Sequence, residues 1–483
     1  MYMTRCLRVT FLLLLAFVFD RPALAQNWSL EDTVVITDVN IVDVRAGVIL
    51  PEQTVVIDKG RIVAVGSRKD TRYPRNAPVI INGKGSYLIP GLWDMHVHLS
   101  FGDWFPRAQE ISLPLFVANG VTGVRDMGSE LATIQIWRNE IEGQRLIGPR
   151  IMTSGPMLDG PKPRFPSSIA ISTPEDGRRA VQNLKQDGAD FIKLQSLLPR
   201  DAALAIADEA KKQDVPFEGH VPDSVRASEM SNTGMRSFEH LTGILEGSSP
   251  LEDSFLNGDK TEIKLLDSYD PERAASLAAL LAKNQTWQCP TLVREPAVYL
   301  LDATDSGEDP HVKYVPASWS SRTWKTIADV VKTAYVEPLD TRKKFVDMEL
   351  RAVQALHKAG VPFLAGTDTP PAAYVYPGFS LHEELQRFVA AGFTPLEALQ
   401  TATINPARFF KMENQLGTVE KGKFADLVFL DANPLDDIRN TQKVAAVILN
   451  GRYFSKADLQ KILQRVEESA KKDAPPKQAQ GVF

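Results

Sequence analysis

Two histidines separated by one residue, His96 and His98, are the first candidates for chemistry in this chain. They lie in a mostly apolar segment, residues 88–99, that is typical of a buried β-strand. Residues two apart on a strand point to the same face. Two neutral imidazoles at that spacing can hold one metal ion of the kind that nitrogen donors favour, such as Zn, Mn, Fe or Co. A His-x-His pair also arises by chance, so further ligands must come from other parts of the chain.

Further candidate ligands stand within or at the ends of other apolar runs. These are Lys193, His220, His240 and Asp368. Lys193 lies inside an apolar run, where an unpaired charge is costly. A single histidine at such a place is more often structural than ligating. Four histidines with a lysine and an aspartate, in the order expected around one barrel, instead favour one metal site; His311, His357 and His382 lie elsewhere.

The elements that must position these residues alternate between strands and helices. Eight candidate strands cover residues 91–99, 121–127, 150–157, 191–195, 216–221, 237–241, 287–293 and 362–368. Several follow a helix that ends in glycine, as Gly120 and Gly360 indicate. Eight such units within residues 89–410 predict an α/β fold, a (β/α)8 TIM-like barrel, whose strand ends meet at one mouth. The alternative is a doubly wound open sheet.

The segments on either side of the barrel are rich in β-branched residues. Residues 26–88 and 411–456 are expected to form one small β-sandwich domain from both ends of the chain. About 50 residues, 294–345, interrupt the barrel as an insertion or lid, and most of their aromatic side chains are expected to pack in a small core of their own. Residues 457–483 are expected to be a helical and then disordered tail.

The first residues have the pattern of a secretory signal peptide, assigned to residues 1–25. Arg5 and Arg8 precede an apolar run, and small residues, Ala23 and Ala25, mark the cleavage site. The run is too short for a stable membrane span. The mature protein is therefore expected in the periplasm or outside the cell. It would keep one cysteine, Cys289, and no internal disulfide.

Composition excludes some partners. The 483 residues are 43% hydrophobic and 24% charged, with a formal net charge of −5 and no basic stripe. Nucleic acid is therefore not expected as a partner, whereas a small molecule or small peptide is. The sequence is compatible with a homo-oligomer but does not determine the oligomeric state.

The motifs together resemble the amidohydrolase superfamily of metal-dependent hydrolases, in its imidazolonepropionase-like and prolidase-like branch. The matching segments are residues 89–98, 120–128, 188–193, 237–241, 365–369, 392–399 and 421–428. The resemblance covers nearly the whole mature chain. It is specific for the superfamily and much less specific for a substrate.

The resemblance implies two divalent metal ions, with zinc as first choice and Mn, Fe or Co as alternatives. By this resemblance, His96, His98 and Asp368 hold the more buried ion, and His220 and His240 hold the more exposed one. Lys193 is carboxylated by CO2 and bridges both ions. Mononuclear members, including imidazolonepropionases, lack such a lysine, so Lys193 favours two metals.

The implied activity is hydrolysis of an amide-type C–N bond in a small peptide, an N-acyl amino acid or a related amide. A hydroxide that bridges the metals attacks the carbonyl, and Asp368 carries a proton to the leaving amine. His220 and His240 hold the ion that polarises the carbonyl. Alternatives are a lactonase or carboxylesterase on the same site, and a non-catalytic barrel that binds a ligand; no expected ligand residue is missing, which disfavours the last.

Some neighbouring residues have no settled role in this comparison. Many dipeptidase-like relatives carry a second histidine after the ligand that corresponds to His220, but Val221 and Pro222 follow here. Arg125 and Asp126 are interpreted either as a pair that orients ligands or as a rim salt bridge. The sequence identifies no clamp for a substrate carboxylate, although residues with suitable chemistry lie in loops. These are Arg164, Tyr374 and Tyr376, while His382 is expected to be structural.

Overall fold

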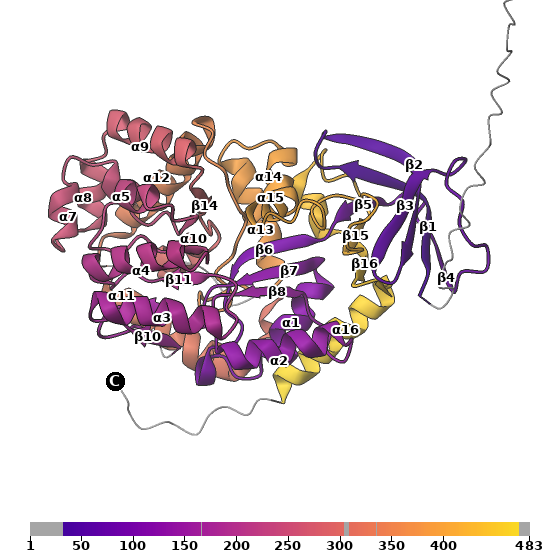
Figure 1. Cartoon of the computed structure of the whole chain (residues 1–483), viewed down its shortest axis with the longest axis horizontal. Helices are drawn as coiled ribbons and strands as arrows, with labels where there is room; N and C mark the ends of the chain where they lie inside the picture. The colour runs from indigo at the N-terminus through magenta and orange to yellow at the C-terminus, as the bar shows by residue number, and fades with distance from the viewer. Residues whose placement is uncertain (1–31, 166, 304–308, 335, 473–483) are drawn as a thin grey trace, which may run out of the picture.

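The computed structural model describes residues 32–165, 167–303, 309–334 and 336–472 (Figure 1). The predicted signal peptide, residues 1–25, and the end of the tail after residue 472 lie outside the described residues. In the described part of the chain, no helix combines the length and apolar character needed to cross a membrane.

Both ends of the chain contribute to one eight-stranded sheet. Its order is β17-β16-β15-β5-β1-β2-β3, with β4 beside β1. Strand β5 pairs in parallel with β1 and antiparallel with β15, so that Leu88 lies opposite Phe429 (Figure 1). Apolar side chains from both ends, including Ile36, Ile57 and Ile448, share one core. The strands are β1 (Val34–Asp43), β2 (Val48–Asp58), β3 (Arg61–Ser67), β4 (Val79–Asn82), β5 (Tyr87–Pro90), β15 (Leu427–Leu430), β16 (Val444–Leu449) and β17 (Arg452–Phe454).

The middle of the chain forms parallel strands in two runs, β6-β7-β8 and β10-β9-β11-β12-β13-β14. The predicted third strand is divided into β8 and β9. Each of these strands is three to six residues long. The bounds are β6 (Leu92–Val97), β7 (Val121–Asp126), β8 (Arg150–Thr153), β9 (Met157–Asp159), β10 (Ser168–Ala170), β11 (Ile192–Leu194), β12 (Phe217–Gly219), β13 (Ser237–Glu239) and β14 (Trp287–Cys289).

The predicted eighth strand, residues 362–368, is not a regular strand. It is joined to its neighbours by isolated bridges, Gln288 with Phe363 and Val97 with Thr369. The amide of Met95 also donates to the carbonyl of Ala365 at 2.8 Å. These contacts connect β14 to β6 and close the ring. The (β/α)8 barrel is confirmed, and the open-sheet alternative is wrong.

Helices surround the barrel on its outside (Figure 1). Local sequence explains their ends: Thr173 forms a capping box with Asp176 at the start of α3, and Gly120 and Gly360 have φ values of 75° and 82° after α1 and α12. The C-terminal helix α16 packs on α1. The helices are α1 (Ala108–Ala118), α2 (Leu131–Glu142), α3 (Pro174–Gln186), α4 (Arg200–Lys212), α5 (Ala227–Asn232), α6 (Ile244–Gly247), α7 (Glu252–Leu256), α8 (Glu262–Asp267), α9 (Pro271–Asn284), α12 (Leu339–Lys358), α13 (Phe379–Ala390), α14 (Pro395–Thr401), α15 (Ile404–Phe409) and α16 (Lys456–Lys471).

The inserted segment is helical and rests on the barrel mouth. It contains α10 (Arg294–Tyr299), a π-helical stretch (Trp319–Trp324) and α11 (Lys325–Ala334). The indole N–H of Trp319 donates to the carbonyl of Pro106, and that of Trp324 to the carbonyl of Pro370, both at 2.9 Å. The expectation of a separate aromatic core is wrong for these two residues. Each ring fills space against the barrel while its N–H finds a loop carbonyl.

Candidate metal centre

The predicted ligands lie at or near the C-terminal ends of the barrel strands. His96 is on β6 with His98 just after it, Lys193 is on β11, His220 and His240 directly follow β12 and β13, and Asp368 ends the eighth barrel segment. Ring centroids of His96 and His240 are 4.5 Å apart, and those of His220 and His240 are 5.0 Å apart. Asp368 Oδ1 lies 3.4 Å from His96 Nε2 and 3.2 Å from His98 Nε2. Residues more than 270 positions apart in the chain thus meet at one mouth.

Every one of the four histidines has its Nδ1 atom engaged. A ring whose Nδ1 is held by a neighbour presents Nε2 as the metal donor, in a fixed orientation. The partners differ in kind: a carboxylate, a backbone carbonyl and two hydroxyls. They are Glu239 for His96 at 2.7 Å, the Gly128 carbonyl for His98 at 3.2 Å, Ser196 for His220 at 2.8 Å and Thr291 for His240 at 2.6 Å.

Two buried polar atoms in this cluster lack a hydrogen-bond partner among the described residues, namely His96 Nε2 and Lys193 Nζ. Burial lowers the pKa of Lys193 to about 8, because it outweighs the opposite effect of the negative charges of Glu239 and Asp368. Burial also lowers the pKa of His96, His220 and His240 well below the ordinary histidine value, so these rings are neutral near pH 7. Neutral imidazoles with an adjacent carboxylate are a donor set that fits a divalent cation.

The local backbone makes room for Lys193. Gly219, directly before His220, has a φ of 131°, and a Cβ there would lie 2.7 Å from Lys193 Cδ. The absence of a side chain at Gly219 therefore leaves space for the Lys193 stem beside β12. Lys193 itself is completely buried, and its charge acts on both His96 and His220. Its amine therefore lies among the histidines rather than in solvent.

Asp368 presents its two oxygens to different neighbours. Oδ1 faces His96 and His98, whereas Oδ2 lies 2.8 Å from Arg294 Nε and 3.9 Å from His240 Nε2. Burial alone would raise the pKa of Asp368, but the hydrogen bond with His98 and the positive charge of Arg294 favour the ionised form, and the pKa is lowered. The carboxylate is therefore ionised at neutral pH and able to ligate a metal.

Positive φ angles cluster around this site. His240 has a φ of 56°, Thr291 of 51° and Asp368 of 59°, although none of them is glycine. Non-glycine residues rarely adopt this region, and such strain is often found at functional sites. These residues lie at or just after the strand ends that surround the mouth.

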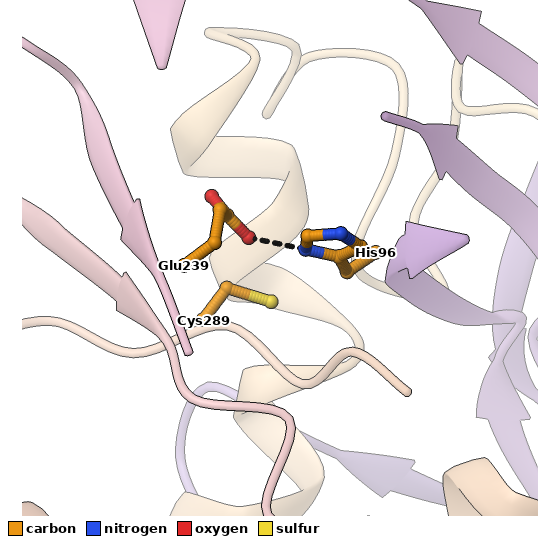
Figure 2. A group of neighbouring side chains, drawn as sticks. All are labelled: His96, Glu239 and Cys289. Atoms are coloured by element: carbon orange, nitrogen blue, oxygen red, sulfur yellow. Dashed lines mark hydrogen bonds and ion pairs between the residues drawn. The ribbon is translucent and has the colours of Figure 1, made fainter. Parts of the chain in front are cut away.

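A second group that could hold a metal shares His96 with the first. His96, Glu239 and Cys289 offer ligand atoms within 4.8 Å of one another (Figure 2). Glu239, however, already forms an ion pair with Arg125 at 2.9 Å, and burial raises the pKa of the Cys289 thiol. This group surrounds Nδ1 of His96, so we interpret it as the support of that ring and the set His96, His98 and Asp368 as the better ligand group.

Arg125 and Asp126 do not pair with each other. Arg125 is fully buried and is ion-paired with Glu218 and Glu239. Asp126 accepts the amide of Leu99 at 3.0 Å and the hydroxyls of neighbouring residues. The rim salt bridge between them is wrong, because neighbours on a strand point to opposite faces. Arg125 does support a candidate ligand, because it is ion-paired with Glu239, whose carboxylate contacts the ring of His96.

Sequence reasoning missed Glu239 and Asp94. Asp94 accepts the Thr367 amide at 3.0 Å and its hydroxyl at 2.7 Å, and burial raises its pKa to about 7. The sequence contained a pattern that could have identified each of these two residues. Asp94 has the same two-residue spacing that links His96 to His98, and Glu239 is an acidic residue in a buried strand directly before a ligand.

One other residue considered in the sequence analysis, His382, has purely structural surroundings. His382, on α13, lies 3.0 Å from the Thr441 hydroxyl and 3.1 Å from the Asn119 carbonyl. A cavity of about 510 Å³ lies at the other end of the barrel strands and is lined by Trp93, Arg150 and other residues, none of them a predicted ligand. The structural role expected for His382 agrees with these contacts.

Comparisons with known proteins agree with this architecture. The model of the amidohydrolase family matches residues 87–453. An ochratoxinase from Aspergillus niger is 24% identical over 474 residues, with 84% of each chain covered. Among solved structures, a bottromycin amidohydrolase has a TM-score of 0.71 at 23% identity and covers 93% of this chain and 91% of its own. A Xaa-Pro dipeptidase with bound methionine in its active site has a TM-score of 0.65 at 20% identity, over 88% of this chain and 100% of its own.

The chain belongs to the amidohydrolase family. Its family match spans the barrel and the later strands of the small sheet, β5, β15, β16 and most of β17, and the structural neighbours share the fold. This confirms the resemblance inferred from the motifs and the expectation of a hydrolase-family enzyme. Members of this family generally use divalent metal ions, and the donor set described above fits that use.

Proposed function

We propose that the protein is a two-metal amidohydrolase that cleaves an amide-type C–N bond in a small peptide, an N-acyl amino acid or a related amide. The observation that carries this proposal is Lys193. Its amine is buried among the ligating histidines and has no hydrogen-bond partner among the described residues.

A bare ammonium at that position is unfavourable, because burial removes its hydration without a compensating partner. The neutral amine can form an N–C bond with CO2 and release one proton to the solvent, which gives an anionic carbamate with two oxygen donors. In the proposed site, His96, His98 and Asp368 would hold one divalent ion, His220 and His240 would hold the other, and the carbamate of Lys193 would supply anionic oxygen ligands. The lack of a Cβ at Gly219 supports this role, since it gives the lysine its path.

Divalent ions bound here, with zinc as first choice, would polarise the scissile carbonyl and lower the pKa of a water molecule. The chain's own residues orient the reaction. Asp368 is ionised and exposes Oδ2 on the side away from His96 and His98, so it can accept the proton of the attacking water and pass it to the leaving nitrogen. Glu239 and Arg125 fix the ring of His96.

The names of two structural neighbours, an amidohydrolase and a dipeptidase, support an amide or peptide bond as the target. The test is a parallel assay of metal-loaded protein on dipeptides, N-acyl amino acids, lactones and carboxylic esters. Turnover of amides is expected to exceed that of esters and lactones. Ester or lactone turnover far above amide turnover would overturn the proposal.

Lys193 allows a second, sharper test. Lys193→Ala should lose turnover and metal, and added short carboxylates such as acetate or propionate should restore part of both by replacing the carbamate. Lys211→Ala, a change on the exposed side of α4, serves as the matched control and should need no rescue. A Lys193→Ala protein with two ions per chain and near wild-type activity contradicts the two-metal assignment.

A further inference from the structure

The inserted segment places a cation beside the predicted proton carrier. Arg294 is the first residue of α10, and its Nε atom lies 2.8 Å from Asp368 Oδ2. The arginine side chain is 26% exposed and the aspartate side chain 10%, so the guanidinium lies where the site opens to solvent. The sequence contained no recognisable clamp for a substrate carboxylate, and Arg294 was not among the candidates.

A buried acid fixes the position of Arg294. Its Nη1 atom lies 2.9 Å from Oε1 of Glu295, whose side chain is only 4% exposed. A guanidinium has five N–H donors in a planar fork, which lets it contact more than one carboxylate at once. Arg294 already does so with Glu295 and Asp368. These two ion pairs fix the position of the guanidinium, which is therefore not a flexible surface group.

Two arginines act on the outer ligands from this side of the mouth. The charge of Arg294 acts on both His220 and His240, and the charge of Arg164, from the loop between β9 and β10, acts on His220. Arg164 is exposed. Two guanidinium groups near the outer ligands favour an anionic substrate group over a neutral or cationic one.

We propose that Arg294 binds a carboxylate of the substrate on the leaving-amine side of the scissile bond, so that the preferred substrates are N-acyl amino acids and dipeptides with a free α-carboxylate. The inference rests on the proposed amide hydrolysis. Asp368 Oδ2 passes the proton to the leaving nitrogen and is also the atom that Arg294 contacts. In an N-acyl amino acid a single carbon separates that nitrogen from the carboxylate, which places the anion next to the guanidinium.

Matched substrates test this inference. The pair is N-acetyl-L-phenylalanine and N-acetyl-L-phenylalaninamide, with the corresponding leucine pair, on metal-loaded wild type, Arg294→Gln and Arg294→Lys. Wild type should prefer the acid by about ten- to a hundredfold in kcat/KM, mainly through KM, as expected for a charge-assisted bidentate contact. Arg294→Gln should lose that preference and Arg294→Lys should keep part of it. Arg322→Gln, an exposed arginine of the same insertion, should change nothing.

A purely structural role of Arg294 gives a different result. If the arginine only orients Asp368, Arg294→Gln lowers kcat for acid and amide equally, and the inference is overturned. Equal turnover of acid and amide by wild type overturns it as well. Circular dichroism and the melting temperature show whether each variant is folded.

Binding of the products provides a readout that needs no turnover. Calorimetric titration of the metal-loaded protein with L-phenylalanine and with L-phenylalaninamide should show tighter binding of the acid, by about tenfold or more, and Arg294→Gln should remove the difference. Failure of the proposed function would appear as no hydrolysis of any amide while this binding difference persists. Equal binding of both products, or no binding of either, overturns the role of Arg294.

Discussion

The two halves of the candidate metal site are supported in different ways. The inner half consists of His96, His98 and Asp368. There, the ring of His96 is held by the carboxylate of Glu239, which is itself paired with the buried Arg125. In the outer half, His220 and His240 are held by the hydroxyls of Ser196 and Thr291. A charged hydrogen bond is about twice as strong as a neutral one and makes the ligand more basic. The inner half should therefore bind its ion more tightly.

The largest effect is expected from removing a ligand of the inner half. His96→Ala should leave less than one ion per chain and no measurable turnover, whereas His220→Ala should keep about one ion, because the tighter inner site remains. Lys193→Ala and Asp368→Ala should also abolish turnover. Metal analysis of folded, purified protein measures the first difference. Activity of His96→Ala within about tenfold of wild type, ~1.4 kcal/mol in the barrier, contradicts the assignment.

The supporting residues give the next largest effect. Glu239→Gln should weaken metal affinity by about 10–100-fold, as is usual when a carboxylate behind a metal-bound histidine is lost. Ser196→Ala should cost less than about tenfold, because a neutral hydroxyl is the weaker partner. Competition with a chelator measures both affinities. Equal losses in the two variants would show that the halves do not differ in this way.

A buried acid links pH to the stability of the outer half. Oε2 of Glu384 accepts the amide of Val293 at 2.8 Å, in the segment that carries Thr291 and Arg294, and burial raises the pKa of Glu384 from 4.5 to about 8. A raised pKa in the folded state means that this group stabilises the fold fully at low pH. The contribution is lost as the pH rises from about 4.5 through about 8, with a limiting slope of about 1.4 kcal/mol per pH unit.

Glu384→Gln keeps an acceptor for Val293 and cannot ionise. The melting temperature of the variant should therefore fall less steeply than that of wild type between pH 5 and pH 8. The difference between the two curves cancels the contributions of other titrating groups. Parallel curves would show that Glu384 does not titrate in this range.

The smallest effect on the site is expected from a substitution of His382, which lies on α13 like Glu384. His382→Gln removes contacts to Thr441 and Asn119 that belong to neither half. Unfolding should become easier by about 1–3 kcal/mol, because buried polar partners are left unsatisfied. Metal content and kcat/KM should not change. A loss of metal in this variant would extend the site to α13.

The barrel was predictable because its signals are local. Apolar runs, glycines such as Gly120 that end helices, and polar residues at the ends of strands are each readable from a few neighbouring residues. The eighth segment was placed correctly, yet its form was wrong, since it closes the ring through isolated bridges at Phe363 and Thr369 rather than as a regular strand. Such pairing depends on neighbours that lie far away in the chain.

The six candidate ligands could be proposed from the sequence because each ends or occupies a strand, whereas the residues that support them could not. The sequence does not distinguish Glu239 from other buried acids, because its ion pair with Arg125 is visible only in the structure. Arg294 follows β14 in an inserted segment, and no spacing relates it to Asp368, which lies 74 positions later. The expectation was wrong for Trp319 and Trp324 because their N–H groups donate to carbonyls in barrel loops.

The sequence by itself determined the class of fold and the types of the candidate ligands, because strand periodicity and the order of polar residues along the chain are local properties. His96 and His98 were already a pair through their spacing. Only the tertiary structure decided which oxygen of Asp368 faces the histidines and which faces Arg294, and which partner holds each Nδ1 atom. Those relations depend on how strands from distant parts of the chain are arranged around the ring, and no local pattern encodes that arrangement.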